Sequence, residues 1–199
     1  MEENISSDYS TKNSIYSENF GNLKSEKENN ENKSLVISKI IAELLTNICE
    51  EGKSNNESNL ILLKPFISKK VPSITIKDYI ERLLKYSKTF NEIVIIVLIY
   101  LDTICAKNKL NLNYYNIHKF IFAAFIVAIK FYEDDYYSIS YYAKLGGISK
   151  KEAISLEYEF LILIDFKLFV NQNLYDKYYN YLSSLNDDDD EDDDELDLL

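Results

Sequence analysis

The stretch FAAFIVAIKFYEDDYYSISYYAKLGG, from Phe122 to Gly147, decides the fold of this chain. It begins with an unbroken apolar run to Ile129, and the next residue is Lys130, followed by an aromatic pair and three acids. A helix that is apolar on every side is stable when other helices enclose it. Burying an isolated ammonium costs on the order of several kcal/mol. The stretch therefore predicts a central core helix whose terminal lysine has a partner.

Length and charge limit the classes of protein to consider. The chain has 199 residues, 46% of them hydrophobic, which favours one domain with one core. Its formal net charge is −11, but the run from Asp187 to Asp197 supplies ten acids and no base, so the rest is close to neutral. A near-neutral domain argues against direct nucleic-acid binding. Arg82 is the only arginine, which also argues against bidentate phosphate clamps.

The expected environment follows from the cysteines and the apolar runs. Cys49 and Cys105 lie within apolar helical patterns and are expected to be reduced core residues of an intracellular protein. The acidic N-terminus lacks the apolar segment of a secretory signal. The longest apolar run, Ile93–Leu101, is too short to span a membrane. We expect a soluble protein of the cytoplasm, the nucleus or both, with no membrane partner.

Four regions follow one another along the chain. Residues 1–33 form a polar leader expected to be disordered, and 34–70 hold a helix over 35–51 and a connector that is broken by Pro65 and followed by Pro72. Residues 71–182 hold the folded domain, and 186–199 form an acidic tail expected to be disordered. Within the domain, apolar periodicity and two capping boxes, Thr75/Asp78 and Ser149/Glu152, predict helices over 75–87, 91–106, 115–132, 138–144, 149–165 and 174–185. The fold class is therefore all-α, with five short-looped helices and one flanking helix on each side.

The sequence offers little for catalysis. There is one histidine, His118, within an apolar helix, where a structural role is expected. Four glycines form no phosphate-binding loop, and no set of metal ligands recurs at a useful spacing. We expect no enzyme activity, cofactor, metal or small-molecule substrate.

Two charged residues contrast with their helices. Lys130 ends the apolar third helix, and Glu157 interrupts the fifth, where Leu161 shares its face. They could pair with each other, or Lys130 could extend to solvent. Alternatively, both could point outward from an apolar patch and bind the backbone groups of a partner.

Three segments resemble the cyclin box. They are YLDTI in the second helix, FAAFIVAIKFYEDDYYSISYYAKLGGIS in the third and fourth, and LEYEFLILIDFKL from Leu156 to Leu168. The resemblance covers about Val71 to Leu182 and is strongest to the phosphate-pathway cyclins, the P and U types. A single five-helix box with flanking helices is the fold that it implies.

The resemblance implies a regulatory subunit that binds and activates a cyclin-dependent protein kinase at its C-helix. The residues that match family contacts with the kinase are Lys130, Phe131, Glu157, Leu161, Phe166 and Leu168. Cell-cycle cyclins pair a first-helix arginine with the aspartate that is here Asp102, and Arg82 is the candidate substitute. The first helix lacks the family's substrate-docking pattern. A non-activating cyclin-fold adaptor or transcription-type interaction module remains the alternative.

Overall fold

A computed structural model describes residues 35–51, 61–87, 89–90 and 92–190, all of them in helices and connecting turns without a strand. The leader over 1–33 and the last nine residues of the acidic tail lie outside this part of the chain. The chain divides into a unit Met1–Val36, of which only the last two residues are described, and a unit Ile37–Leu199. The second unit contains the folded domain. The all-α prediction is confirmed.

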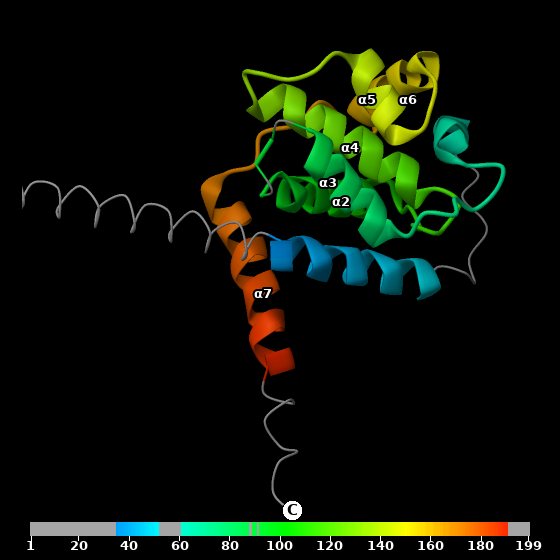
Figure 1. Ribbon diagram of the computed structural model, residues 1–199. Helices are drawn as coiled ribbons and strands as arrows, with labels where there is room; N and C mark the ends of the chain where they lie inside the picture. The colour runs from blue at the N-terminus through cyan, green and yellow to red at the C-terminus, as the bar shows by residue number, and fades with distance from the viewer. Residues whose placement is uncertain (1–34, 52–60, 88, 91, 191–199) are drawn as a thin grey trace, which may run out of the picture. The chain divides into compact units, whose positions relative to one another are not determined.

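Two buried helices form the centre of the domain. They are α3, Ile93–Asn108, and α4, Ile117–Tyr132, and they pack against each other (Figure 1). Every residue of α4 up to Ile129 is buried except Lys119, and α3 is buried without a break from its start to Leu101. Such helices are apolar all round and need neighbours on every side. The prediction from Phe122–Ile129 is confirmed.

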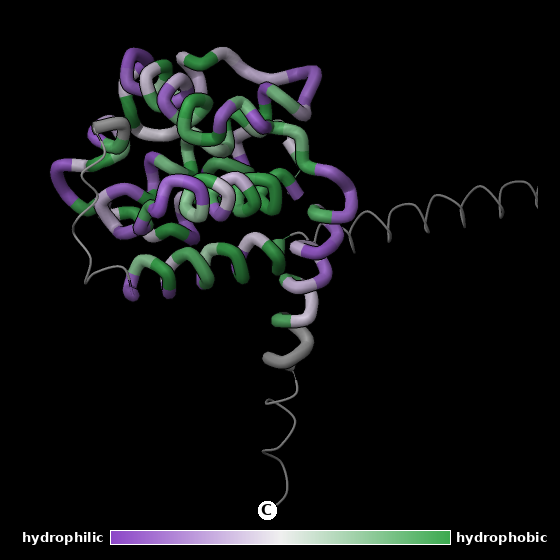
Figure 2. Tube along the Cα trace, turned by 180° about the vertical axis from the view of Figure 1, so that it is seen from behind, coloured by the Kyte–Doolittle hydropathy of each residue, from purple (hydrophilic) through white to green (hydrophobic). Residues whose placement is uncertain are grey.

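The remaining helices cover this pair. Helix α2 is Ile76–Tyr86, α5 is Ile139–Gly146 and α6 is Lys150–Leu163. Helix α2 contacts α4 and α5. Helix α6 also packs on α4 and α5. The part of the N-terminal helix that belongs to this unit, residues 37–51, places its apolar face on α2, α3 and α4. Hydrophobic positions gather in the interior of the domain, whereas the connecting loops are largely hydrophilic (Figure 2).

The capping residues begin their helices as predicted. Thr75 Oγ1 accepts from the Asp78 amide at 3.0 Å, and Ser149 Oγ accepts from the Glu152 amide at 3.1 Å. These bonds satisfy amides that have no partner within the helix. The Glu152 carboxylate makes an ion pair with Lys119 of α4, at 2.8 Å. That contact ties the first turn of α6 to the first turn of α4.

Two elements differ from their predictions. The connector begins with a 3₁₀ helix, η2, Ile61–Phe66, which includes Pro65. Pro65 is the fifth of its six residues, and the element ends one residue later, as expected because proline has no amide hydrogen with which to continue a helix. The last helix, α7, is Gln172–Asp190, so the first residues of the acidic tail continue its backbone. Its attachment to α3 is described below.

Candidate functional site

Lys130 and Glu157 form an ion pair that links the end of α4 to the middle of α6. Lys130 Nζ donates to both carboxylate oxygens of Glu157, at 2.6 and 2.8 Å. The side chains keep 30% and 20% of their accessible surface, respectively. Of the arrangements that the sequence left open, pairing within the chain is the one observed. The pair is also partly accessible, as expected of Lys130.

The apolar candidates lie on the two helices that carry this pair and on the segment after α6. Leu161 lies one turn after Glu157 on α6, and its carbonyl accepts from the Phe166 amide at 3.0 Å. Phe131 follows Lys130, is 46% exposed, and contacts Tyr132 edge to face. The predicted residues thus come from the end of α4, the second half of α6 and the segment after α6.

Leu168 is held in place through its backbone. Its carbonyl oxygen accepts from the hydroxyl of Tyr100 on α3, at 2.6 Å, and from that of Tyr132 on α4, at 3.1 Å. The Tyr132 oxygen in turn accepts from the Val170 amide at 2.8 Å. Burial raises the pKa of the Tyr100 hydroxyl well above its usual range, so this donor keeps its proton. These two tyrosines were not singled out from the sequence, because their role depends on which backbone they reach.

The turn after α6 holds two consecutive residues in the left-handed region. Asp165 has φ 62° and Phe166 has φ 55°, a conformation that costs non-glycine residues roughly 1–3 kcal/mol each. The turn is stabilised by the Phe166 amide bond to Leu161 and by ion pairs of Asp165 with Lys167 and Lys107, at 3.1 and 3.5 Å. The same lysines lower the pKa of Asp165, Lys167 foremost. The turn leaves the Phe166 side chain 64% exposed.

A shallow groove of about 260 Å³ lies beside this segment. Tyr132 and Val170 form part of its wall, and the rest comes from the start of α3 and the first turns of α7. Phe90, at its edge, is largely exposed. The groove therefore adjoins the candidate face, the surface of Lys130, Phe131, Glu157, Leu161, Phe166 and Leu168, only through Tyr132, which follows Phe131 in the chain.

Arg82, the candidate partner of Asp102, makes no ion pair with it among the described residues. The Asp102 carboxylate accepts from the hydroxyl of Tyr178 on α7, at 2.6 Å. The guanidinium of Arg82 instead lies over the ring of Tyr79, on the side of α2 that faces α4 and α5. Asp102 therefore fastens the flanking helix to α3. The predicted pairing failed because sequence spacing does not give the rotation of α2 about its axis.

The two cysteines and the histidine lie within the described part of the chain. Cys49 is buried, Cys105 is partly buried, and both are free thiols. Burial raises the pKa of each to about 12, which keeps them protonated and unreactive. His118 is buried, with Nε2 3.0 Å from the carbonyl oxygen of Ile74. Among the described residues no group of three His, Cys, Asp or Glu side chains is placed to hold a metal ion.

A lone box of five helices, with a lysine–glutamate pair at one end and flanking helices, matches the class implied by the resemblance. Residues 22–168 match the family model described as Cyclin. The chain belongs to the cyclin family.

Its relatives include cyclins of the PHO85 and U types. It is 37% identical over 153 residues to PHO85 cyclin-like protein psl1 of Schizosaccharomyces pombe, covering 71% of this chain and 63% of the relative. It is 35% identical to Cyclin-U4-1 of Arabidopsis thaliana, covering 74% and 76%, and 35% identical to PHO85 cyclin-7 of Saccharomyces cerevisiae, covering 74% and 59%. The chain thus spans about three fifths of the length of the two yeast relatives. No helix in the described residues has the length and apolar character needed to cross a membrane.

Proposed function

We propose that this chain binds a cyclin-dependent protein kinase and activates it by docking on the kinase C-helix. The observation that carries the proposal is the partly exposed Lys130–Glu157 pair, with exposed Phe131 next to Lys130 in the chain and exposed Phe166 on the turn that follows α6. The family membership and the PHO85-type relatives support a kinase as the partner. Such a complex would act in the cytoplasm or the nucleus.

The pair leaves hydrogen-bonding capacity for a partner. An ammonium has three donors, and a carboxylate has about four acceptor sites. The two bonds within the pair leave one ammonium N–H and further carboxylate lone pairs at an accessible edge. A docked helix end offers free carbonyls and amides of the matching kinds. Phe131, Phe166 and Leu161 supply apolar area next to these polar groups, an arrangement typical of interface hot spots.

Activation would require no chemistry on this chain. A protein kinase is active when its C-helix glutamate pairs with the phosphate-binding lysine. A subunit that binds only this state of the kinase shifts the equilibrium toward it, up to the limit of its differential affinity. The alternative is an adaptor with the same fold that binds without activating. The exposed Phe166 on a strained turn is consistent with a partner-binding surface in either case, so a kinase activity assay is needed to separate the activator from the adaptor.

The test uses purified full-length protein. Affinity purification with mass spectrometry identifies the bound kinase, and the activity of that kinase is then measured with and without this chain. We expect a kinase to be recovered and its activity to rise on binding. Recovery of a kinase without activation would support the adaptor, and recovery of no kinase would refute the proposal.

The matched variants for this experiment are Glu157→Gln and Glu152→Gln. Each removes one ion pair between α4 and α6, at 2.6 Å and 2.8 Å respectively, but only Glu157 lies on the candidate face. Kinase recovery should fall for Glu157→Gln and persist for Glu152→Gln. Equal recovery of the kinase by both variants would remove Lys130 and Glu157 from the site.

A further inference from the structure

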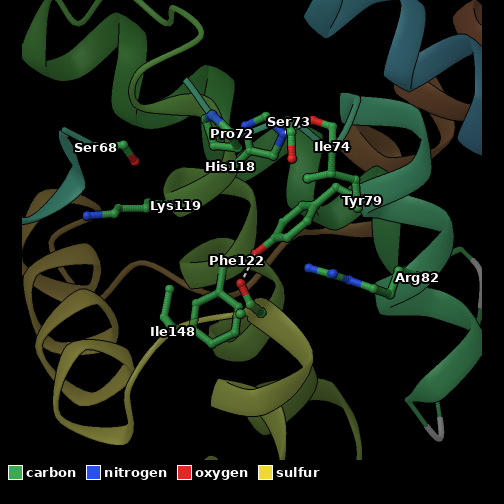
Figure 3. A pocket seen from close by; sticks show the side chains of 12 residues that line it. Ser68, Pro72, Ser73, Ile74, Tyr79, Arg82, His118, Lys119, Phe122 and Ile148 are labelled. Atoms are coloured by element: carbon green, nitrogen blue, oxygen red, sulfur yellow. Dashed lines mark hydrogen bonds between the residues drawn. The ribbon is translucent and has the colours of Figure 1, made fainter. Parts of the chain in front are cut away.

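A cavity of about 380 Å³ lies between α2, the first turns of α4, the end of α5 and the segment that precedes α2 (Figure 3). Its volume falls in the range of small-molecule sites, about 300–1,000 Å³. Its polar lining includes Arg82, Tyr79, His118 and Ser73, and no acidic residue lines it. The cavity is formed by other elements than the Lys130–Glu157 face, apart from their common helix α4.

Arg82 lines this cavity and has one unpartnered nitrogen, Nε. Its Cζ lies 5.1 Å from the centroid of the Tyr79 ring, and Figure 3 shows the guanidinium extending from α2 toward the Tyr79 hydroxyl. Its Nε is shielded from solvent and has no hydrogen-bond partner. No carboxylate among the described residues forms an ion pair with it, whereas the neighbouring Lys119 is paired with Glu152. A guanidinium has five donors arranged to match an oxyanion, so Arg82 is placed for a ligand with acceptor oxygens.

Arg82 calls for hydrogen-bond acceptors on the ligand, whereas His118 calls for a hydrogen-bond donor. Its side chain is 6% exposed, and Nε2 lies 3.0 Å from the carbonyl oxygen of Ile74. A carbonyl oxygen only accepts, so Nε2 carries the proton, and Nδ1 of the neutral ring has a lone pair. Nδ1 is buried without a partner. A ligand that completes this site therefore brings a proton donor as well as acceptor oxygens.

We propose that this cavity binds a phosphate group, free or as a monoester, in its singly protonated form. The unprotonated oxygens would accept from Arg82, and the P–OH group would donate to His118 Nδ1. The Tyr79 hydroxyl donates to the Gly146 carbonyl over a long 3.4 Å bond and is near enough to the cavity to turn to the ligand (Figure 3). Sulfate and carboxylate carry no proton at neutral pH and satisfy Arg82 alone. The single arginine had argued against a phosphate clamp, but that one guanidinium lines a cavity without an acidic lining residue, and the nearby Glu152 is paired with Lys119.

Nuclear magnetic resonance tests the proposal directly, because the chain has one arginine and one histidine. The Nε–Hε signal of Arg82 and the ring signals of His118 are each unique in labelled full-length protein. We expect both to shift saturably on addition of inorganic phosphate at constant ionic strength. Addition of O-phosphoserine in a second arm distinguishes a free anion from a monoester. Sodium sulfate should bind about tenfold or more weakly, because it cannot donate to His118.

Two variants complete the experiment. Arg82→Gln should weaken phosphate binding, read from the His118 signals, by about tenfold to a hundredfold, the range expected for a lost charge-assisted contact. Lys85→Gln removes one positive charge from the exposed side of the same helix and should leave the affinity unchanged. Shifts that follow ionic strength alone, or that persist in Arg82→Gln, would overturn the site. Equal affinity for sulfate would overturn the role of His118. Kinase recovery plays no part in these outcomes, so this site and the proposed function fail separately.

Discussion

Exchanging the charges of Lys130 and Glu157 separates a role inside the domain from a role in binding a kinase. The variants are Lys130→Glu, Glu157→Lys and the two together. The contacts of 2.6 and 2.8 Å and the partial exposure place this pair between exposed pairs, worth about 0.2–1 kcal/mol, and buried pairs, whose disruption costs about 3–5 kcal/mol. Each single reversal also creates a contact between like charges. We expect each to lower the free energy of unfolding by roughly 2–4 kcal/mol in urea denaturation.

The double exchange should recover most of that stability, because the opposite charges again face each other. Kinase affinity should respond differently. A partner that donates to the glutamate and accepts from the lysine would meet the reverse arrangement, so affinity should stay lower by about 2–5 kcal/mol, which is about thirtyfold to several thousandfold. Affinity is measured by titration against the recovered kinase. A double variant that is stable and binds the kinase as tightly as the original chain would refute the reasoning, because the pair would then serve the fold alone.

Three further predictions concern the strained turn, a close contact and the buried histidine. Phe166→Asn should leave the free energy of unfolding in urea unchanged or raise it by up to about 1 kcal/mol, because asparagine tolerates the left-handed conformation. Kinase affinity should fall in the same variant. A large loss of stability would contradict the strain at this residue. Gly146→Ala should lower the unfolding free energy by about 1–3 kcal/mol, since the added Cβ would lie 2.5 Å from ring carbons of buried Phe122; an unchanged melting curve would show that the ring moves freely. Burial, and to a lesser extent the charge of Arg82, lowers the pKa of His118 in the folded chain. As the pH falls, the histidine therefore gains its second ring proton in the unfolded chain before it does so in the folded chain. The free energy of unfolding should fall as the pH drops below about 6.5. The slope due to this residue is at most about 1.4 kcal/mol per pH unit, and His118→Gln should remove it from the pH dependence of urea denaturation; an identical profile in the variant would rule the histidine out.

Local patterns predicted the helices because local contacts determine them. Thr75 and Ser149 each accept from an amide three residues ahead, and this spacing is visible in the sequence. The apolar run of α4 likewise indicated a central helix. The cyclin resemblance then directed attention to Lys130 and Glu157, although residue types alone left open whether they pair.

Other features depend on the rotation and crossing of helices, which spacing does not give. Arg82 faces α4 and α5, and Asp102 meets Tyr178 of α7, so their expected pairing did not occur. The left-handed turn at Asp165 and Phe166 has no glycine or asparagine to indicate it. The cavity around Arg82 is lined by segments that lie far apart in the sequence, so no sequence motif predicted it.

The hydroxyls of Tyr100 and Tyr132 both bond the Leu168 carbonyl, so the position of the segment after α6 depends on the distance between α3 and α4. Tyr100 and Tyr132 reach the same oxygen from α3 and α4, so that oxygen keeps both bonds only at one separation of the two helices. A core substitution that moves α3 against α4 by a few tenths of an ångström breaks or lengthens one bond and displaces the backbone that follows Phe166. Variation deep in the core can therefore tune partner affinity without any change in the residues that touch the partner.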